Sequence, residues 1–191
     1  MSQQPNQRFK DKVAVVTGGN SGIGLATARA FAREGARVAI TGRSEATLKA
    51  AEKEIGPGTL ALRTDMAKVE EIVTAMDRIR GVFGRIDALF VNHGVAHPAT
   101  FESVTEERFD ETVDTNVKGA FFTIQKALPL LTRESAVILN ASNSYSEHTG
   151  RSVVIRFVET CPIRHFIVSK PFPYSPTARS SGIRVAEGRW I

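Results

Sequence analysis

Between residues 12 and 141 the chain alternates short apolar runs, rich in β-branched residues, with longer segments whose apolar residues recur at helical spacing. Continuous apolar runs are typical of parallel strands buried on both faces, whereas a spacing of three to four residues indicates an amphipathic helix. We therefore predict strands at residues 12–17, 37–41, 59–63, 86–91 and 136–140. Helices are predicted between them at residues 24–34, 44–55, 69–83 and 106–131, the last with a bend near Thr115 and Asn116.

This strict alternation predicts an α/β fold, a Rossmann-type doubly wound parallel sheet with right-handed crossovers. The alternation stops after the fifth predicted strand. There, residues 143–150 have the pattern of a loop, and only residues 153–158 and 165–168 could form short strands. Four prolines exclude a long helix beyond residue 160. We predict one Rossmann domain at residues 1–150, incomplete at the C-terminal edge of its sheet, and a basic tail at 151–191 that is not a separate domain.

The composition excludes several classes of protein. With 42% hydrophobic and 24% charged residues, the chain of 191 residues is too apolar and too balanced in charge to be intrinsically disordered. No apolar run approaches the ~18 residues of a membrane helix, and the polar N-terminus lacks the pattern of a secretory signal. The single cysteine, Cys161, excludes an intramolecular disulfide and any multi-cysteine metal site. We expect a cytoplasmic protein without a bound metal.

The net charge of +5 belongs to the tail. Residues 1–150 hold 18 basic and 18 acidic residues, whereas residues 151–191 hold seven basic and two acidic ones. A nucleic-acid-binding domain would concentrate basic residues on one face of its folded body. We therefore expect neither nucleic acid nor a membrane as partner.

A glycine-rich loop, Thr17-Gly-Gly-Asn-Ser-Gly-Ile-Gly24, joins the first predicted strand to the first predicted helix. In such a loop, Gly18 permits a tight turn, Gly22 lets the backbone approach a pyrophosphate, and Gly24 lets the helix pack closely on the strand. The free N–H groups and the dipole at the helix start favour a phosphate there. The alternative is an ordinary glycine-rich turn.

With its Gly-x-x-x-Gly-x-Gly spacing, this loop resembles the cofactor loop of the short-chain dehydrogenase/reductase family. The resemblance extends over residues 10–142, because further family motifs occur in the same order. These are Asp65-Met66 after the third strand, Asn92-His93-Gly94 after the fourth, Thr115-Asn116-Val-Lys-Gly119 on the long helix, and Ser142 after the fifth. His93 departs from the family pattern, which has a small residue at this position.

The resemblance implies a role for each matching residue. The pyrophosphate would be held by Gly18, Asn20, Ser21, Gly22, Ile23 and Gly24, the adenine by Asp65 and Met66, and the ribose side by Asn92 and Gly94. Asn116, which bends the helix and holds a water in the family, and Ser142, which orients the substrate, are the catalytic-type positions. Taken alone, Asp65 could instead cap the third helix, Asn92 and Gly94 could form a turn, and Asn116 could be solvated.

The residue after the second strand selects between the two nicotinamide dinucleotides. A carboxylate there binds a ribose hydroxyl and repels a 2′-phosphate, whereas a guanidinium binds that phosphate. This chain has Gly42 followed by Arg43, which favours NADP(H) over NAD(H). NADP-dependent relatives often carry a second basic residue inside the glycine loop, where this chain has Ser21. A solvated Arg43 at a helix start is the alternative.

The family's reaction uses a tyrosine that exchanges a proton with the substrate oxygen and a lysine four residues later. An adjacent ammonium favours the phenolate, whose formation near neutrality requires a pKa about 3 units below the ordinary value of 10. The two tyrosines here, Tyr145 and Tyr174, are followed at that spacing by Thr149 and Ala178. We therefore do not assign Tyr174 as the catalytic acid, and the C-terminal part suggests a truncated or frame-altered product.

The sequence thus predicts an NADP-dependent oxidoreductase acting on a small-molecule alcohol or carbonyl compound, with no prediction of which one. A homo-oligomer is possible, but the atypical C-terminal part weakens the case for one. One alternative is a relative that binds the nucleotide without turnover. Another is a non-binding fragment that folds poorly, because its fifth strand becomes an exposed edge.

Overall fold

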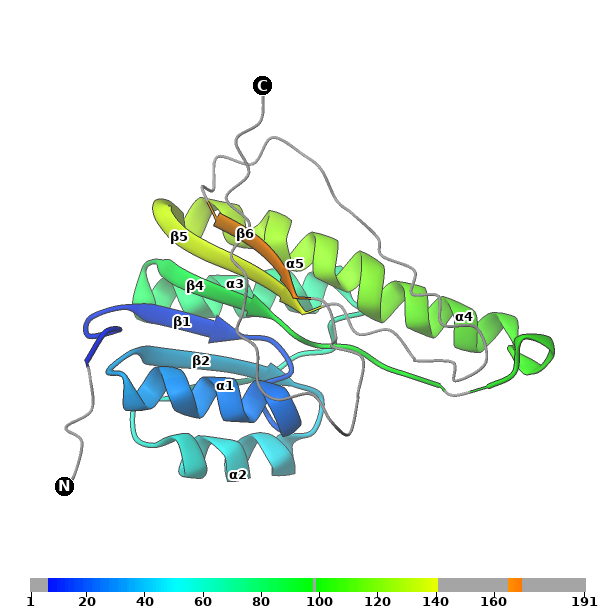
Figure 1. Ribbon diagram of the computed structural model, residues 1–191, viewed down its shortest axis with the longest axis horizontal. Coiled ribbons are helices and arrows are strands. Elements are labelled where there is room, and N and C mark those ends of the chain that lie inside the picture. Colours follow the sequence, from blue (N-terminus) through cyan, green and yellow to red (C-terminus); the bar gives the residue numbers. More distant parts are fainter. Residues whose placement is uncertain (1–6, 98, 141–164, 170–191) are drawn as a thin grey trace, which may run out of the picture.

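A six-stranded parallel sheet in the order β3-β2-β1-β4-β5-β6 forms the centre of the molecule (Figure 1). The computed structural model describes residues 7–97, 99–140 and 165–169, the last of these as backbone only. This strand order confirms the predicted doubly wound α/β architecture. The strands are β1 (Val13–Val16), β2 (Arg37–Gly42), β3 (Leu60–Arg63), β4 (Ile86–Val91), β5 (Leu131–Asn140) and β6 (His165–Ser169).

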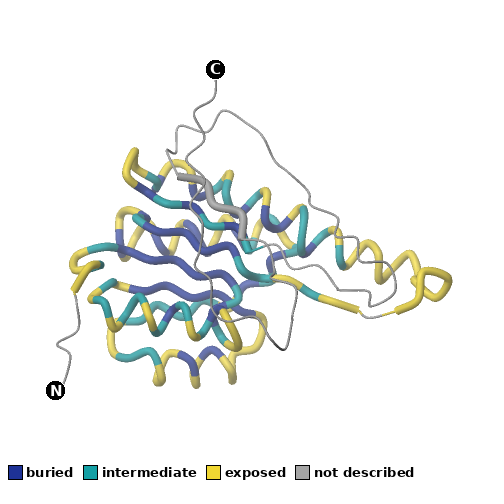
Figure 2. Tube along the Cα trace, in the orientation of Figure 1, coloured by how far each residue is buried: buried dark blue, intermediate teal, exposed yellow. Residues whose placement is uncertain are grey.

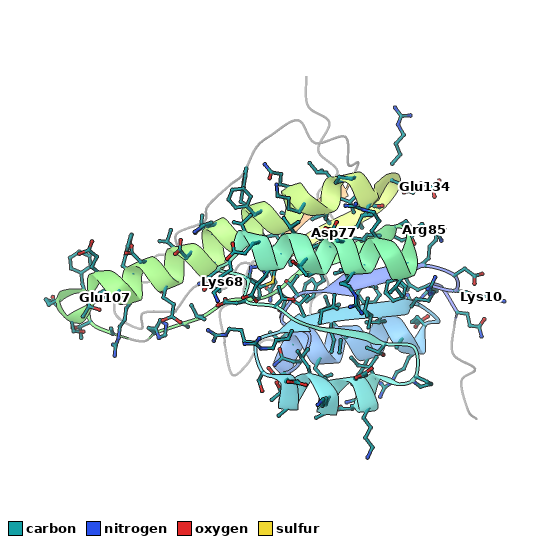
Figure 3. The ribbon with its side chains drawn as sticks, turned by 180° about the vertical axis from the view of Figure 1, so that it is seen from behind. Lys10, Lys68, Asp77, Arg85, Glu107 and Glu134 are labelled. Atoms are coloured by element: carbon teal, nitrogen blue, oxygen red, sulfur yellow. The ribbon has the colours of Figure 1, made fainter. Side chains whose placement is uncertain are left out.

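Helices cover both faces of the sheet (Figure 1). Helices α1 (Gly22–Arg33) and α2 (Glu45–Ile55) pack on one face, and α3 (Val69–Phe83) and α5 (Gly119–Ala127) on the other. Helix α4 (Glu106–Val113), with Glu107 near its outer end, extends beyond the sheet (Figure 1 and Figure 3). It has no buried residue. Short helical turns complete the order: η1 (Phe101–Ser103), the π-helix η2 (Asp114–Lys118) and η3 (Leu128–Leu130).

The core consists of two apolar clusters, one on each face of the sheet. Every residue of β1 is buried, which matches the continuous apolar run in the sequence (Figure 2). One cluster joins the sheet to α3 and α5 through residues such as Ile72 and Ile79, and the other joins it to α1 and α2 through residues such as Ala28 and Leu48. The yellow, exposed positions lie mainly on the outer sides of the helices (Figure 2). The sheet is therefore a closely packed platform for the loops at its edges.

The prediction of one long helix over residues 106–131 is wrong in its extent. The helix is divided by the π-helix η2, which lies at the predicted bend, and it ends at η3, where Pro129 occurs. Strand β5 also begins at Leu131, five residues earlier than predicted. Its first part is held by Ser135, whose hydroxyl donates to the Ile86 carbonyl at 2.6 Å and accepts from Thr132 N at 2.8 Å.

Strand β6 pairs in parallel with β5, in the register Ile138↔Ile167. The predicted short strand at 165–168 is thereby confirmed, and β5 is not the exposed edge that the poorly folding alternative requires. The predicted loop at 143–150 and the possible strand at 153–158 lie outside the described residues. In the described part of the chain, no helix is long and apolar enough to cross a membrane.

Candidate functional site

The carboxyl ends of β1 and β4 adjoin at the point where the strand order reverses, which is where open α/β sheets bind ligands. The glycine loop leaves β1 at this point. Gly18 has a φ of +63°, a conformation that favours glycine, so the tight turn predicted for it is observed. A Cβ on Gly24 would collide with the Gly18 carbonyl oxygen. The close approach of α1 to the strand therefore requires glycine there.

The start of α1 provides donors for an anion. The first backbone N–H groups of a helix have no partner within it, and the side chain of the N-cap residue Ser21 does not satisfy them. Gly22 has a φ of +51°, and a Cβ there would meet nothing within 4 Å. Ile23 is 67% exposed, so this end of the helix is accessible. The residues present therefore fit a pyrophosphate group.

Asn20 anchors the loop to the next crossover. Its Nδ2 donates to Thr47 Oγ1 of α2 at 2.9 Å, and Gly19 N donates to the Thr41 carbonyl at 3.0 Å. A Cβ on Gly42 would lie 2.6 Å from Asn20 Oδ1. Asn20 therefore occupies the space that a side chain at Gly42 would need. This is the position at the end of β2 where the family's carboxylate would start.

The Thr17 hydroxyl connects the ends of β1 and β4. It accepts hydrogen bonds from the backbone N–H groups of Asn92 at 2.9 Å and His93 at 3.2 Å. The Asn92 side chain lies against the glycine loop, with Nδ2 3.5 Å from the Gly18 carbonyl oxygen, and its Oδ1 accepts from Asn140 Nδ2 of β5 at 2.8 Å. The site therefore extends over three adjacent strand ends. Asn140 was not predicted, because its partner is 48 residues away in the sequence.

His93, the residue that departs from the family motif, is neutral. Its Nδ1 lies 2.8 Å from the Thr17 hydroxyl, whose two lone pairs already accept backbone N–H groups. The hydroxyl has one proton to donate, and Nδ1 lies closer to it than the Phe90 carbonyl oxygen at 3.5 Å, so we assign the hydroxyl proton to Nδ1 and the ring proton to Nε2. Burial lowers the pKa of His93 to about 4, and the backbone of Thr115 partly opposes this shift. Nε2 is buried without a hydrogen-bond partner among the described residues, in a space that a Cβ on Gly119 would enter.

Asn116 holds the loop after β4 to the π-helix. Its Oδ1 accepts from Val95 N and its Nδ2 donates to the Val95 carbonyl, both at 2.8 Å. Gly94 adjoins this contact, since a Cβ there would lie 3.3 Å from Asn116 Oδ1. The structure thus brings Asn92, Gly94 and Asn116 together, and the alternative of a solvated Asn116 is wrong.

Asp65 and Met66 follow β3 on the same edge of the sheet. Asp65 Oδ1 accepts from Ala67 N at 3.1 Å, but the N-cap of α3 is Lys68, so the alternative of Asp65 as the helix cap is wrong. Met66 is 4% exposed, and its sulfur accepts from the Thr41 hydroxyl at 3.7 Å. Its side chain therefore belongs to the core, with its backbone at the edge of the site.

Arg43 extends from the end of β2 toward α4. One guanidinium nitrogen lies 3.7 Å from Glu111 Oε1, and the guanidinium side chain is 62% exposed. The other carboxylate oxygen of Glu111 lies 2.9 Å from Nε2 of His97, in the loop after β4. Neither Glu111 nor His97 was predicted as a site residue, because ion pairs between distant exposed residues leave no local sequence signal.

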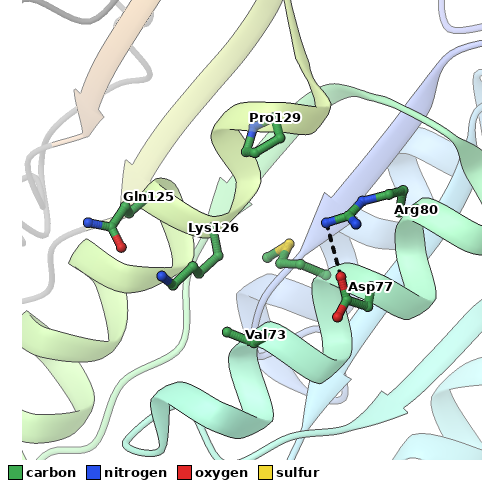
Figure 4. Close-up of a pocket in the computed structure, with 7 residues that line it drawn as sticks. Val73, Asp77, Arg80, Gln125, Lys126 and Pro129 are labelled. Carbon is green, nitrogen blue, oxygen red and sulfur yellow. Dashed lines mark ion pairs between the residues drawn. The ribbon is translucent and has the colours of Figure 1, made fainter.

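Three other candidate residues, Ser142, Tyr145 and Tyr174, lie outside the described residues. Within the described ranges no group of three or more His, Cys, Asp or Glu residues could hold a metal ion. A hollow between α3 and α5, next to the Asp77–Arg80 ion pair of 3.0 Å, contains none of the predicted cofactor residues (Figure 4).

Comparisons with known proteins agree with this fold. A family model described as short chain dehydrogenase matches residues 12–155. An oxidoreductase of Sarocladium schorii is 32% identical over 180 residues, which cover 94% of this chain and 71% of that protein. Levodione reductase of Leifsonia aquatica is 36% identical over 152 residues, which cover 74% of this chain and 56% of the relative.

A solved structure gives the same result. The 3-ketoacyl-(acyl-carrier-protein) reductase from Brucella melitensis, complexed with NADH, aligns with a TM-score of 0.67 and 33% identity over 70% of this chain and 58% of that one. The chain thus spans little more than half the length of the Leifsonia and Brucella enzymes. On the match to the family model and to these relatives, the chain belongs to the short-chain dehydrogenase family.

Proposed function

We propose that this chain binds NADP(H) at the carboxyl ends of β1, β2 and β4, and that it is an oxidoreductase for an alcohol or carbonyl compound. The observation that carries the proposal is the glycine loop, whose positive φ at Gly18 and close contact at Gly24 leave the start of α1 open to a diphosphate. The NADH bound to the Brucella reductase supports a nicotinamide dinucleotide in general.

Each part of the coenzyme has residues to hold it. The loop from Gly18 to Gly24 would bind the pyrophosphate, with Asn20, Ser21, Gly22 and Ile23 between these ends. Asp65 and the backbone of Met66 would border the adenine, and Asn92 and Gly94 the nicotinamide ribose. Arg43 would bind the 2′-phosphate, because its guanidinium is exposed and can donate two parallel hydrogen bonds. This arrangement would make residues 1–150 the dinucleotide-binding domain.

When bound, the coenzyme supplies the hydride that converts a carbonyl compound into an alcohol, or accepts it in the reverse direction. The chain itself would have to position the substrate and move the proton. Asn116 would keep the loop after β4 in place beside the coenzyme, and the Ser142 hydroxyl would hydrogen-bond the substrate oxygen. In this sequence neither tyrosine is followed by lysine at the family spacing.

The missing Tyr-x-x-x-Lys pair favours a second candidate function, nucleotide binding without turnover. The two candidates share the coenzyme site and differ only in the proton-transfer groups. Oxidation of NADPH across a panel of carbonyl compounds, abolished by Ser142→Ala, would support the enzyme. Saturable NADPH binding with no oxidation of any compound would support the second candidate.

Isothermal titration calorimetry with NADPH and NADH tests the binding itself. We expect saturable heat with NADPH and an affinity for NADH that is about tenfold weaker, because a charge-assisted hydrogen bond contributes about 1.5 kcal/mol or more. Arg43→Leu should remove this difference and leave NADH binding nearly unchanged. Folded protein that gives no heat with either coenzyme would contradict the proposal.

A further inference from the structure

Three side chains from separate parts of the fold meet beside the proposed 2′-phosphate position. Arg43 follows β2, His97 lies in the loop after β4, and Glu111 lies on α4, and the Glu111 carboxylate contacts both of the others. We name these three residues the Glu111 cluster. It lies between the end of β2 and the loop after β4, so the carboxylate shares the guanidinium that would receive a phosphate.

We propose that Glu111 is a specificity-determining residue, which weakens binding of a 2′-phosphate at Arg43 and so reduces the preference of this chain for NADP(H) over NAD(H). The inference rests on the proposed function. Two effects act in the same direction. The carboxylate occupies the guanidinium that the phosphate needs, and its negative charge repels the phosphate. NADH lacks the 2′-phosphate, so neither effect changes its binding.

His97 keeps the carboxylate in this position. Its Nε2 lies 2.9 Å from Glu111 Oε2, whereas Arg43 lies 3.7 Å from the other oxygen. The shorter contact, with His97, holds the carboxylate on the side of the loop after β4. The contact with Arg43 is longer and more exposed to solvent. A phosphate can therefore replace Glu111 at Arg43 without breaking the contact to His97, but the carboxylate then remains close to it.

The expected effect is modest, because the groups are exposed. A carboxylate about 6 Å from a phosphate of charge near −2, in water with physiological salt, weakens binding about three- to eightfold. Glu111→Gln should raise the affinity for NADPH by this factor, with NADH unchanged within about twofold. The gain should shrink in about 1 M salt, where the Debye length is about 3 Å.

Asp110→Asn is the matched control. It removes one negative charge from the adjacent position of α4, which is also exposed and has no ion pair with Arg43 in the described structure. The double variant Arg43→Leu with Glu111→Gln tests whether the effect involves the guanidinium. We expect Asp110→Asn to leave the NADPH-to-NADH affinity ratio unchanged. The gain from Glu111→Gln should be smaller in the Arg43→Leu background, because only the direct repulsion between carboxylate and phosphate then remains.

Calorimetric titration of five proteins with both coenzymes decides the matter, because the double variant is compared with Arg43→Leu alone. A selective gain for NADPH in Glu111→Gln alone supports the inference. Equal changes for both coenzymes, the same gain in Asp110→Asn, or no change in Glu111→Gln would overturn it while leaving dinucleotide binding intact. Wild-type protein that binds neither coenzyme would overturn both the inference and the proposed function, so the two failures are distinguishable.

Discussion

At the scale of single residues, the neutral His93 makes the folded state sensitive to acid. An unfolded histidine has a pKa near 6.5, whereas burial lowers the pKa of His93 to about 4. Between these values the unfolded chain binds more protons, so the stability from this residue is present above about pH 6.5 and is lost as the pH falls toward 4. Between pH 7 and pH 5 we expect the free energy of unfolding to fall by about 2 kcal/mol because of His93.

Urea denaturation at pH 7 and pH 5 measures this loss. His93→Asn keeps an acceptor for the Thr17 hydroxyl but cannot be protonated, so its stability should change by about 2 kcal/mol less between the two pH values. Gly81→Ala in α3 removes no titratable group and provides the control variant, which should keep the full wild-type change. An equal change in wild type and His93→Asn would show that His93 is not the buried neutral group.

Two glycines in helices should respond in opposite ways to alanine. Gly24→Ala places a methyl group against the Gly18 carbonyl oxygen and 2.7 Å from Asn92 Nδ2, so we expect a loss of about 1–3 kcal/mol in stability. Gly81→Ala in α3 meets nothing within 4 Å and should gain about 0.5–1 kcal/mol. Thermal or urea unfolding measures both changes. Similar gains in the two variants would mean that helix propensity, and not the contact of Gly24 with Gly18 and Asn92, determines the effect.

The sequence predicted those site residues whose role follows from local backbone geometry. Gly18 and Gly24 are of this kind, because a tight turn and a helix start are encoded within one short loop. Asn140 and Glu111 were missed, because their partners come from other strands and helices. The role of His93 was also missed, because an isolated histidine after a strand does not indicate whether its ring faces solvent or the Thr17 hydroxyl.

At the scale of elements, Asn116 joins the π-helix η2 to the loop after β4, because its side chain bonds both the N–H and the carbonyl of Val95. Asn116→Asp keeps the acceptor for Val95 N but sets a carboxylate oxygen against the Val95 carbonyl, so we expect a loss of about 1.5–3 kcal/mol at pH 7. Urea denaturation measures this loss. Asp114→Asn, in the same π-helix, removes only the exposed contact to Lys118 and should change stability by less than about 1 kcal/mol. A comparable loss in both variants would contradict the role of Asn116.

Most elements were predicted within one or two residues, because apolar periodicity and terminal glycines define them. Helix α3 and strand β4 begin and end at the predicted residues, and Gly84 closes α3 with a φ of +76°. The exceptions are the long helix and the start of β5. There the boundaries depend on tertiary contacts, such as the hydrogen bond from the Ser135 hydroxyl to the Ile86 carbonyl, which periodicity does not reveal.

At the scale of the whole molecule, topology is the most predictable property. Right-handed crossovers and a buried parallel sheet leave few arrangements for five alternating units, and the observed order β3-β2-β1-β4-β5 is the doubly wound one. The pairing of β6 with β5 was less certain from the sequence, because four prolines near this short apolar run leave no periodic pattern. The strand order brings the separate site residues to one edge of the sheet.

Because the two apolar clusters share this sheet, binding at its edge should stabilise the whole described domain. A dinucleotide that binds only the folded chain raises the free energy of unfolding by about 2.7 kcal/mol at a free concentration 100 times Kd. For a domain of this size we expect Tm to rise by about 5–10 °C. Gly24→Ala should abolish most of this rise, whereas Gly81→Ala, far from the loop, should keep it. Thermal unfolding followed by circular dichroism, with and without NADPH, measures the rise, and an equal rise in both variants would mean that the coenzyme binds somewhere other than the glycine loop.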